Sequence, residues 1–410
     1  MTDRCKTFWL INQYASTPQT GMGGRHYYLA LEMAKQGHNV FLISGSFGHK
    51  LRIKENQKRL VEKKFIDGFT HVKLRLLKYP NSHSPKRAIN WFLFAFLLGF
   101  FIKNRLPRPD AILYSSPALI GYLGARHVAH KLNVPLIFEV RDIWPMTLIE
   151  LGGFSPRHPF MRFMQWIEDK AYKECRLVLS TLPNAVEHMV NRGMCRKKFA
   201  WVPNGFSKAE LAKPKPLDPA AVAQLPPDKF IVGYTGTLGV ANALDTLLDA
   251  AERLKNDPDV VFVLVGGGKE KVALQRRAED NGLQNIIFID PIPKAQVQSM
   301  LQRFDVCFLG WKDEPLYQYG VSPNKLPEYL VSGKPIIHSF SGACDPVAEA
   351  AAGLTVPAED PVAIAKAIVE LKNLPQAQRA IMGQRGQAVA YEKYEYDKLA
   401  GQIVRLLEMG

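Results

Sequence analysis

The chain has 410 residues, of which 47% are hydrophobic and 22% are charged. This composition excludes wholesale disorder and low-complexity or collagen-like sequence, and the length predicts two domains rather than a single core. The five cysteines are scattered and form no Cys-x-x-Cys pair, so neither a zinc site nor a disulfide framework is indicated, and reduced thiols in a cytoplasmic protein are expected.

The net charge of +15 is unevenly distributed along the chain. Residues 1–110 contain 19 Lys and Arg against 6 Asp and Glu, a net charge of +13, which leaves only +2 for all the other residues. A basic first quarter indicates a polyanionic partner, and nucleic acid, a phosphorylated ligand and an anionic membrane surface are the candidates.

Apolar runs alternate with amphipathic stretches in the first half, a pattern typical of parallel sheets covered by helices. Strands are expected at 8–12, 40–45, 72–77, 111–115, 136–140, 177–180 and 200–203. Helices are expected at 24–36, 89–104, 119–132, 159–174 and 184–192.

One expected helix is unusually aromatic, because fifteen uncharged residues lie between Arg87 and Lys103. A helix of that length extends about 22 Å, which is short of the roughly 30 Å hydrocarbon core of a bilayer, so it is not expected to span a membrane. The basic clusters on both sides favour a helix lying in an anionic membrane interface, within a membrane-associating segment 86–108. A buried core helix is the alternative. The residues expected to enter the lipid are Trp91, Phe92, Phe94, Phe96, Phe100 and Phe101.

A stretch rich in proline and lysine predicts a linker at 206–229. A second alternating set follows, with strands expected at 230–234, 260–265, 286–289, 306–309, 335–338 and 354–356. The predicted organisation is therefore an N-terminal domain at 1–205, a C-terminal domain at 230–385, and a C-terminal helix at 386–410 that crosses back to the first domain. The fold class is α/β, with two doubly wound Rossmann-like domains facing a cleft.

Glycine-rich turns follow the first strand of each domain, at Gly21-Met-Gly23-Gly24 and at Gly236-Thr-Leu-Gly239. Backbone N–H groups at such turns bind phosphate, and glycine allows the phosphate to approach closely. Neither turn is a dinucleotide-binding fingerprint, because Gly-x-Gly-x-x-Gly is absent and no acidic residue ends the next strand. A plain sharp turn is the alternative at both places.

The segment from Val321 to Pro335 carries more chemistry. It predicts a helix that begins near Pro323, whose N-terminal dipole would attract an anion, with Lys325 adding a point charge. Glu328, one turn further on, could accept hydrogen bonds from a ribose diol. The alternative is a capped helix with an exposed lysine and glutamate.

Together, the pattern S-P-N-K-x-x-E-Y-x-x-x-G-K-P, the Pro-Asn-Gly before the linker, the turn at Val265 to Gly268 and the glycine-rich first loop resemble family 4 retaining glycosyltransferases of the GT-B fold. The resemblance covers nearly the whole chain. Two further segments, Glu139-Val-Arg-Asp-Ile-Trp-Pro145 and Tyr234-Thr-Gly-Thr-Leu-Gly239, resemble the bacterial branch that contains the L-fucosaminyltransferases of O-antigen and capsule assembly. Those enzymes extend a sugar carried on undecaprenyl diphosphate.

The resemblance implies that Glu328 matches the second glutamate of the family's paired-Glu motif, which holds the nucleotide ribose. Gly320 stands where the first glutamate is usual. Thr237 and Asn242 stand where many members carry the arginine and lysine that bind the diphosphate. Lys325 is therefore the main candidate to compensate the charge of the leaving UDP.

Arg141 and Arg25 are the next candidates for that compensation. In the matching family motif a His-Asp pair occupies the place of Arg141-Asp142. Arg141 cannot act as a base, but Asp142 could orient or deprotonate an acceptor hydroxyl. A structural ion pair between the two is the alternative. A separate D-x-D, Asp257-Pro-Asp259, is interpreted as a polar turn, so no catalytic metal and no cofactor are expected.

These observations predict a UDP-sugar on the second domain and a polyprenyl-diphosphate-linked saccharide on the first. The acceptor hydroxyl is expected near Gly23, Gly24 and Asp142, beside Arg25. The donor residues are Gly236, Thr237 and Lys325 for the diphosphate, Glu328 for the ribose, Gly267, Gly268 and Ile292 for the uracil, and Ser322 beside them.

The expected function is a retaining, metal-independent transfer of a sugar, such as an N-acetylated amino sugar, in lipopolysaccharide O-antigen or capsule assembly. The protein is expected at the cytoplasmic face of the bacterial inner membrane, as a peripheral or monotopic protein. A GT-B UDP-sugar 2-epimerase, which needs no lipid contact, is one alternative. A basic nucleic-acid-binding protein is the other, although no zinc-finger or RRM signature is present and no nucleic-acid partner is expected.

Overall fold

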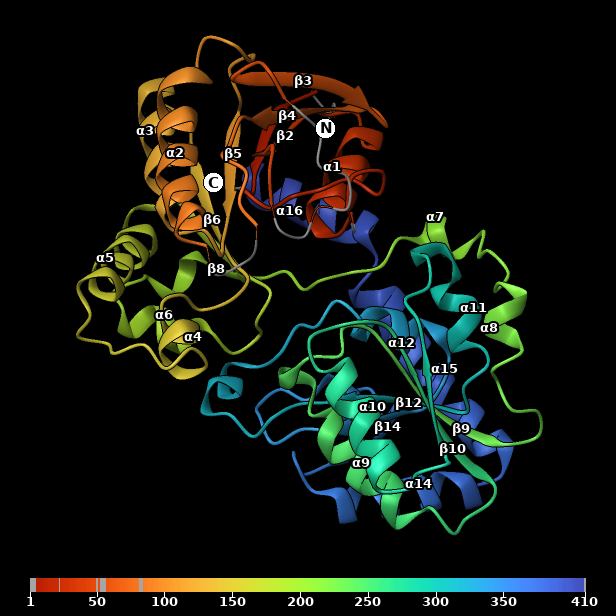
Figure 1. The fold of residues 1–410 in the computed structure, drawn as a ribbon. Helices are drawn as coiled ribbons and strands as arrows, with labels where there is room; N and C mark the ends of the chain where they lie inside the picture. Colours follow the sequence, from red (N-terminus) through yellow and green to blue (C-terminus); the bar gives the residue numbers. More distant parts are fainter. Residues whose placement is uncertain (1–4, 22, 49–50, 52–56, 81–83, 409–410) are drawn as a thin grey trace. The chain divides into compact units, whose positions relative to one another are not determined.

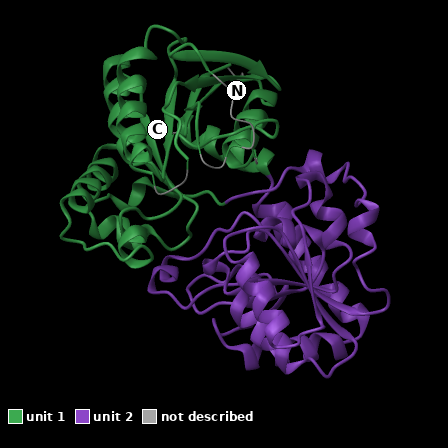
Figure 2. Cartoon of the chain, in the orientation of Figure 1, with its two compact units in different colours: residues 1–203, 396–410 green, residues 204–395 purple. Residues whose placement is uncertain are grey.

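The computed structural model describes residues 5–21, 23–48, 51, 57–80 and 84–408. The chain divides into two compact units (Figures 1 and 2). Unit 1 comprises Met1–Pro203 together with Tyr396–Gly410, and unit 2 comprises Asn204–Glu395.

Unit 1 is an α/β domain with one large sheet. Its strands are β1 (Thr7–Ile11), β2 (Asn39–Gly45), β3 (Val61–Ile66), β4 (Phe69–Leu74), β5 (Ala111–Ser115), β6 (Leu136–Val140), β7 (Leu177–Ser180) and β8 (Phe199–Trp201). Its helices are α1 (Arg25–Lys35), α2 (Pro85–Phe101), α3 (Ile120–Leu132), α4 (Met146–Glu150), α5 (Pro159–Glu174), α6 (Val186–Asn191), the 3₁₀ helix η1 (Arg196–Lys198) and α16 (Tyr396–Glu408).

Unit 2 is a second α/β domain with a smaller sheet. Its strands are β9 (Phe230–Thr235), β10 (Val260–Val265), β11 (Ile286–Ile289), β12 (Val306–Gly310), β13 (Ile336–Ser339) and β14 (Gly353–Val356). Its α-helices are α7 (Lys208–Leu211), α8 (Pro219–Val222), α9 (Leu244–Arg253), α10 (Lys271–Asp280), α11 (Val297–Leu301), α12 (Leu326–Ser332), α13 (Pro346–Glu349), α14 (Pro361–Asn373) and α15 (Gln376–Lys393). Its 3₁₀ helices are η2 (Val240–Asn242), η3 (Lys294–Gln296) and η4 (Pro315–Tyr319).

Both sheets are doubly wound, as the alternating pattern predicted. The strand order is β3-β4-β2-β1-β5-β6-β7-β8 in unit 1 and β11-β10-β9-β12-β13-β14 in unit 2. All neighbouring strands are parallel except the pair β3 and β4. In unit 1, for example, α2 and α3 cover one face of the sheet, and α1 and α16 cover the other (Figure 1). Central strands such as β1 are buried on both faces, which explains their continuous apolar runs.

The sequence pattern missed β3 and placed the next strand, β4, three residues too late. β3 is an edge strand whose middle residues are charged and exposed, so it carries no apolar run. The overlooked signal is Asp67-Gly68 between the two strands, where both residues have positive φ, of 47° and 91°. Asp-Gly is a typical two-residue hairpin turn.

The segment expected to be a linker, 206–229, lies within unit 2 and forms α7 and α8. The Lys215 N–H donates to the carbonyl of Ala295 at 2.9 Å, and the Gln296 side chain donates to the carbonyl of Pro216 at 2.9 Å. Proline content therefore marks irregular backbone here, but that backbone is packed against η3.

The chain returns to unit 1 through α16, which begins at Tyr396. Buried residues recur at three- and four-residue spacing along this helix, with Leu399, Ala400 and Ile403 all inside the core. The Tyr396 ring stacks on Tyr28 of α1 with ring centroids 5.0 Å apart. The last helix is therefore part of the unit 1 core, although 192 residues of unit 2 separate it from the rest of that core.

We expect Leu399→Ala to destabilise unit 1 by about 2–5 kcal/mol, because it removes a fully packed side chain and leaves a cavity between α16 and α1. Urea unfolding monitored by circular dichroism measures the change. Arg405→Ala, at an exposed position of the same helix, is the matched control and should change stability by about 0.5 kcal/mol or less. Equal effects of the two substitutions would show that α16 does not pack as described.

Candidate active site

The unit 2 site lies where the strand order of the sheet reverses. The chain runs outward from β9 through β10 to β11 and then returns to place β12 on the other side of β9. In open parallel sheets, ligands bind outside the carboxyl ends of the strands at this reversal. The loops that follow β9 and β10 and the start of α12 supply the residues discussed next.

Lys325 is the central cation of this region. Its Nζ donates to the hydroxyl oxygen of Tyr234 at 2.7 Å and to Oδ1 of Asn242 at 2.8 Å. The ammonium also lies 4.2 Å from the centroid of the Tyr234 ring, which is a cation–π contact. Among the described residues, no carboxylate forms an ion pair with Lys325, so both of its hydrogen-bond partners are neutral.

Tyr234 and Asn242 also brace the glycine-rich loop. The Tyr234 hydroxyl donates to the carbonyl of Thr237 at 2.7 Å, and the Asn242 side-chain amide donates to the same carbonyl at 3.0 Å. Each side chain therefore gives its proton to the loop and offers its oxygen to Lys325. This shared geometry fixes where the cation stands relative to the loop.

Glycine is required where the loops after β9 and β10 meet. Gly236 has φ of 147°, and a Cβ there would lie 3.2 Å from Cε of Lys325. Gly266 has φ of 149°, and a Cβ there would come within 1.9 Å of the Gly236 carbonyl oxygen. The Leu238 N–H donates across to the carbonyl of Gly267 at 2.9 Å. Larger residues would force the two loops apart.

Burial lowers the pKa of Lys325 to about 7. The cause is desolvation of the ammonium, which neutral acceptors only partly offset. A half-buried cation without a carboxylate partner, beside two glycine-rich loops, is suited to receive an anionic ligand. The predicted diphosphate residues Gly236, Thr237 and Lys325 are thus brought together by the fold, with Gly236 and Thr237 exposed.

α12 differs from the expected helix. It begins at Leu326 rather than near Pro323, has seven residues, and has Lys325 at its N-cap. The local charge is therefore that of the lysine, and the helix is too short to add a substantial dipole.

Glu328 lies in the first turn of α12, with 18% of its side chain exposed. Its Oε1 forms an ion pair with Nζ of Lys294, which belongs to η3 after β11. The Gln298 side chain donates to the Glu328 backbone carbonyl at 3.2 Å. The carboxylate predicted to hold a ribose is thus already bound to a lysine that the sequence pattern did not single out.

The remaining predicted donor residues line the same edge. Ser322 is half-buried, and its carbonyl accepts a hydrogen bond of 2.6 Å from the side chain of Asn204. Ile292 is half-buried, while Gly267 and Gly268 lie in the loop after β10. Gly320, which the resemblance was expected to align with the first glutamate of the family motif, has φ of 83° and donates its N–H to the Tyr317 carbonyl at 3.0 Å.

The unit 1 site has the same topological position, between β1 and β5. Asn12, directly after β1, donates its side-chain amide to the carbonyls of Ser115 and Ser116 at 3.2 and 3.0 Å. Gly23 and Gly24 lead into α1 with φ of 67° and 100°. Met22 of the predicted loop lies outside the described residues.

Arg25 is not available as an anion-binding group, contrary to the sequence-based expectation. Its side chain is fully buried, and its Nε and Nη2 donate to Oε1 of Glu139 at 2.9 and 2.8 Å. Its other donors reach the carbonyls of Val202 and Pro203. Because each of its three nitrogens donates to an acceptor inside the domain, the Arg25 guanidinium fixes the start of α1 and is not free to bind an anionic ligand.

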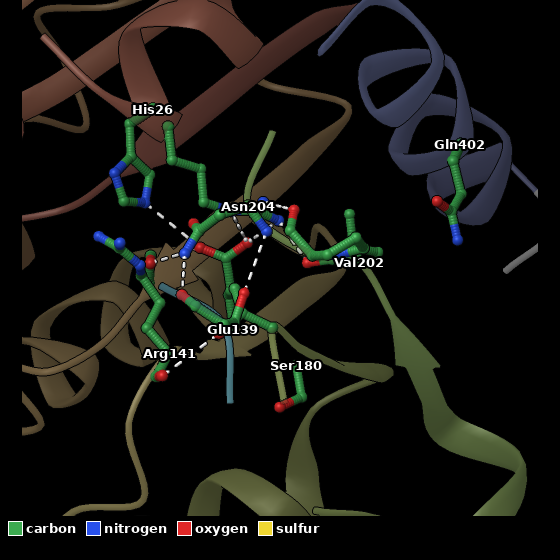
Figure 3. Close-up of polar contacts among 12 residues, drawn as sticks. His26, Glu139, Arg141, Ser180, Val202, Asn204 and Gln402 are labelled. Atoms are coloured by element: carbon green, nitrogen blue, oxygen red, sulfur yellow. Dashed lines mark hydrogen bonds and ion pairs between the residues drawn. The ribbon is translucent and has the colours of Figure 1, made fainter. Parts of the chain in front are cut away.

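Glu139 completes a buried polar network (Figure 3). Its Oε2 accepts from the Ser115 hydroxyl at 2.6 Å and lies 3.3 Å from Nε2 of His26. Burial opposes ionisation of this carboxyl, but Arg25 and His26 outweigh that penalty and hold the pKa of Glu139 well below its usual range. Burial lowers the pKa of His26, against the opposing effect of Glu139.

Arg141 and Asp142 follow β6 at the same edge. Asp142 is exposed and Arg141 is half-buried, and the structure records no ion pair between them in the described part of the chain. The Arg141 Nε is buried without a hydrogen-bond partner among the described residues. Its backbone is held instead, since its N–H donates to the Ser116 hydroxyl at 2.9 Å.

The predicted lipid-facing residues of α2 divide into two sets. Trp91 and Phe94 are 8% and 0% exposed, so both belong to the core, and the expectation that they enter lipid is wrong. The Trp91 indole donates to the Tyr14 hydroxyl at 2.6 Å. The exposed large apolar residues of this helix, spaced three or four residues apart, are Ile89, Phe92, Phe96 and Phe100, while Phe101 is half-buried.

The exposed face of α2 extends onto α5. Phe92 stacks on Phe163 at a centroid distance of 6.3 Å, and Phe163 stacks on Trp166 at 6.0 Å. Trp166 is 51% exposed. Aromatic rings from both helices are thus exposed or partly exposed, and we call the set Phe92, Phe96, Phe100, Phe163 and Trp166 the aromatic face.

The D-x-D sequence is a turn, as predicted. It lies between α9 and β10, where Asp257 binds Lys372 at 2.6 Å and accepts from the Asp259 N–H at 3.1 Å. In the described ranges, no three His, Cys, Asp or Glu side chains are grouped so that they could hold a metal ion.

Two family models match the chain. One described as Glycosyltransferase Family 4 matches residues 20–210, and one described as Glycosyl transferases group 1 matches residues 229–373. The first match lies in unit 1 except for residues 204–210, which belong to unit 2, and the second match lies within unit 2. Together with the two doubly wound sheets, they define the chain as a glycosyltransferase of the GT-B fold.

The chain is similar to a protein of Escherichia coli (strain K12) assigned by name to colanic acid biosynthesis, the glycosyl transferase WcaI. The two are 23% identical over 322 residues, which is 77% of this chain and 78% of that protein.

Solved structures share the fold. Sucrose-phosphate synthase of Thermosynechococcus elongatus superposes with a TM-score of 0.76 at 18% identity, over 98% of each chain. Anabaena HepE in complex with UDP-glucose superposes with a TM-score of 0.65 at 16% identity, over 99% of this chain and 100% of that one.

We expect Glu139→Gln to destabilise unit 1 by about 3–5 kcal/mol, because it leaves the Arg25 guanidinium buried without its counter-charge. Urea unfolding measures the loss. Glu187→Gln breaks an ion pair with Arg196 in which both side chains are 57% exposed, and it should cost about 1 kcal/mol or less. A Glu139 variant as stable as the Glu187 variant would contradict the network.

Proposed function

We propose that this glycosyltransferase transfers a sugar from a UDP-sugar bound on unit 2 to a polyprenyl-diphosphate-linked saccharide bound on unit 1. The single observation that carries the donor assignment is the position of the Lys325 ammonium. It is held by neutral partners beside the glycine-rich loops, at the point where the strand order of the sheet reverses. The UDP and UDP-glucose complexes of the structurally similar HepE support the choice of nucleotide.

In this proposal Lys325 replaces the arginine and lysine that many family members carry where this chain has Thr237 and Asn242. Asn242 stands where a lysine or arginine is usual, and its side chain orients Lys325 instead of binding phosphate itself. Departure of UDP develops negative charge at the diphosphate, and a desolvated ammonium stabilises that charge more strongly than a hydrated one. Lys325→Ala should therefore lower the rate of transfer at least about tenfold.

On unit 1 we assign the acceptor hydroxyl to the edge formed by Gly23, Gly24 and Asp142. Asp142 is exposed and free of any recorded ion pair with Arg141, so its carboxylate can orient the hydroxyl. The resemblance to family 4 supports retention of the anomeric configuration. Its fucosaminyltransferase branch and the likeness to WcaI support an N-acetylated amino sugar and assembly of a surface polysaccharide.

We further propose that the aromatic face rests on the cytoplasmic surface of the bacterial inner membrane. No helix among the described residues is long and apolar enough to cross a bilayer. The face instead presents exposed rings from α2 and α5, while Lys86, Lys103 and Arg105 at the two ends of α2 are exposed cations. Rings in the acyl region and cations at lipid phosphates suit a peripheral protein whose acceptor carries a polyprenyl chain.

Thermal-shift measurements with UDP-, GDP- and dTDP-sugars test the donor assignment. We expect UDP-sugars to raise the melting temperature and Lys325→Ala to reduce that rise, because a ligand that binds only the folded state stabilises it. Stabilisation by GDP- or dTDP-sugars alone would overturn the choice of UDP.

We expect UDP binding to be linked to protonation of Lys325. Its pKa of about 7 in the free protein leaves it mostly neutral at pH 8.5, and a bound diphosphate raises that pKa by favouring the charged form. Binding at pH 8.5 should therefore take up about one proton, and affinity should fall as pH rises from 7 to 9. Calorimetry in buffers of different ionisation enthalpy measures the uptake. The same uptake in Lys325→Met would assign the proton to another group.

We expect replacement of Phe92, Phe96 and Phe100 by serine to reduce sedimentation with phosphatidylglycerol vesicles roughly tenfold or more. These side chains are 49%, 52% and 63% exposed, so the substitutions remove apolar surface without opening the core.

The matched control for this triple variant replaces three exposed apolar residues of unit 2, Val272, Val362 and Ile381, by serine. It should bind vesicles as the unmodified protein does. Equal binding of both triple variants would refute the membrane assignment.

A further inference from the structure

The ion pair of Glu328 with Lys294 joins the helix α12 to the 3₁₀ helix η3 in unit 2. Lys294 lies just after β11, and Glu328 lies in the first turn of α12. The lysine holds one carboxylate oxygen, Oε1. Among the residues that the structure describes, no partner is recorded for the other oxygen, Oε2, and the side chain is partly open to solvent.

A carboxylate that is to hold a ribose beside a diphosphate needs two conditions. It must stay ionised near other negative charge, and one oxygen must keep a fixed direction toward the sugar hydroxyls. A cation on the opposite oxygen meets both conditions, because it compensates the charge and fixes the rotation of the carboxylate. Lys325 cannot do this for Glu328, since its ammonium is directed to Tyr234 and Asn242.

We propose that Lys294 is a positioning residue that fixes the Glu328 carboxylate so that its free oxygen accepts a hydrogen bond from the ribose 2′-hydroxyl of the donor. This inference rests on the proposed UDP-sugar function. Lys294 itself contacts no substrate. It acts through Glu328.

The surroundings of the pair suit this role. A small pocket beside it is lined by Phe206, Ser207 and Glu210 together with Lys294 and Glu328. Glu210 lies near enough to act electrostatically on Lys294. The backbone at Glu328 is held separately, by the hydrogen bond from Gln298. Loss of the Lys294 side chain therefore frees the carboxylate without releasing the helix that carries it.

The test compares the affinities for UDP and 2′-deoxy-UDP, measured by calorimetry on the full-length protein. The unmodified protein should bind UDP about tenfold more tightly than 2′-deoxy-UDP, because the deoxy ligand leaves a carboxylate oxygen unpaired. Lys294→Ala and Glu328→Ala should each bring that ratio below about threefold. Lys294→Arg should keep it near tenfold.

The control is Lys372→Ala, which also breaks a lysine–carboxylate ion pair of unit 2, at the turn before β10. It should leave the ratio unchanged. Lys294→Gln, which keeps the length of the side chain without its charge, is used if the alanine variant does not fold.

The outcomes separate this inference from the proposed function. If Lys294→Ala weakens both ligands equally and keeps the tenfold ratio, Lys294 is only structural and the inference is overturned, while the donor site stands. If the unmodified protein does not distinguish the two ligands, Glu328 does not hold the ribose, and the inference is overturned with that assignment. If the protein binds neither ligand, the UDP-sugar function itself is overturned.

Discussion

Desolvation of the Lys325 ammonium, without a carboxylate to offset it, is the constraint on which the unit 2 site depends. A protein gains nothing in stability from such an arrangement, because water solvates an ammonium better than a tyrosine hydroxyl and an amide oxygen do. The surrounding residues hold the ammonium in this position. Gly236 leaves room for its side chain, and Tyr234 and Asn242 bind both the cation and the Thr237 carbonyl. An anionic ligand would complete the coordination that these neutral groups leave incomplete.

Unit 1 uses buried charge in the opposite way at the corresponding edge of its sheet. Arg25 and Glu139 are fully buried and form an ion pair, so each charge is neutralised by the other inside the domain. Their function is to hold the start of α1 and the end of β6 in place. In the proposed function, the acceptor hydroxyl is assigned to the exposed Asp142 and the glycine-rich loop. At the same topological position, unit 2 therefore has a lysine without a carboxylate partner among the described residues, whereas unit 1 has a buried ion pair that holds its backbone in place.

Periodicity predicted both sheets because buried parallel strands have continuous apolar runs. It did not predict β3, because the charged residues of that strand face solvent. The positions of Lys325 and Glu328 could also be predicted, since both residues belong to the motif S-P-N-K-x-x-E-Y. The residues that contact them in the structure could not be predicted. Nothing in the sequence near Lys294 indicates a contact with a helix that begins 32 residues later, and the fate of Arg25 depends on Glu139, 114 residues away. On α2, the pattern located the aromatic helix but not which of its rings point inward.

A crystal structure of the protein with bound UDP tests the central claim most directly. The account predicts that a phosphate oxygen lies within about 3 Å of Nζ of Lys325, in contact with the backbone at Gly236. A structure in which the diphosphate lies away from Lys325, with that ammonium still bound only to Tyr234 and Asn242, would contradict it.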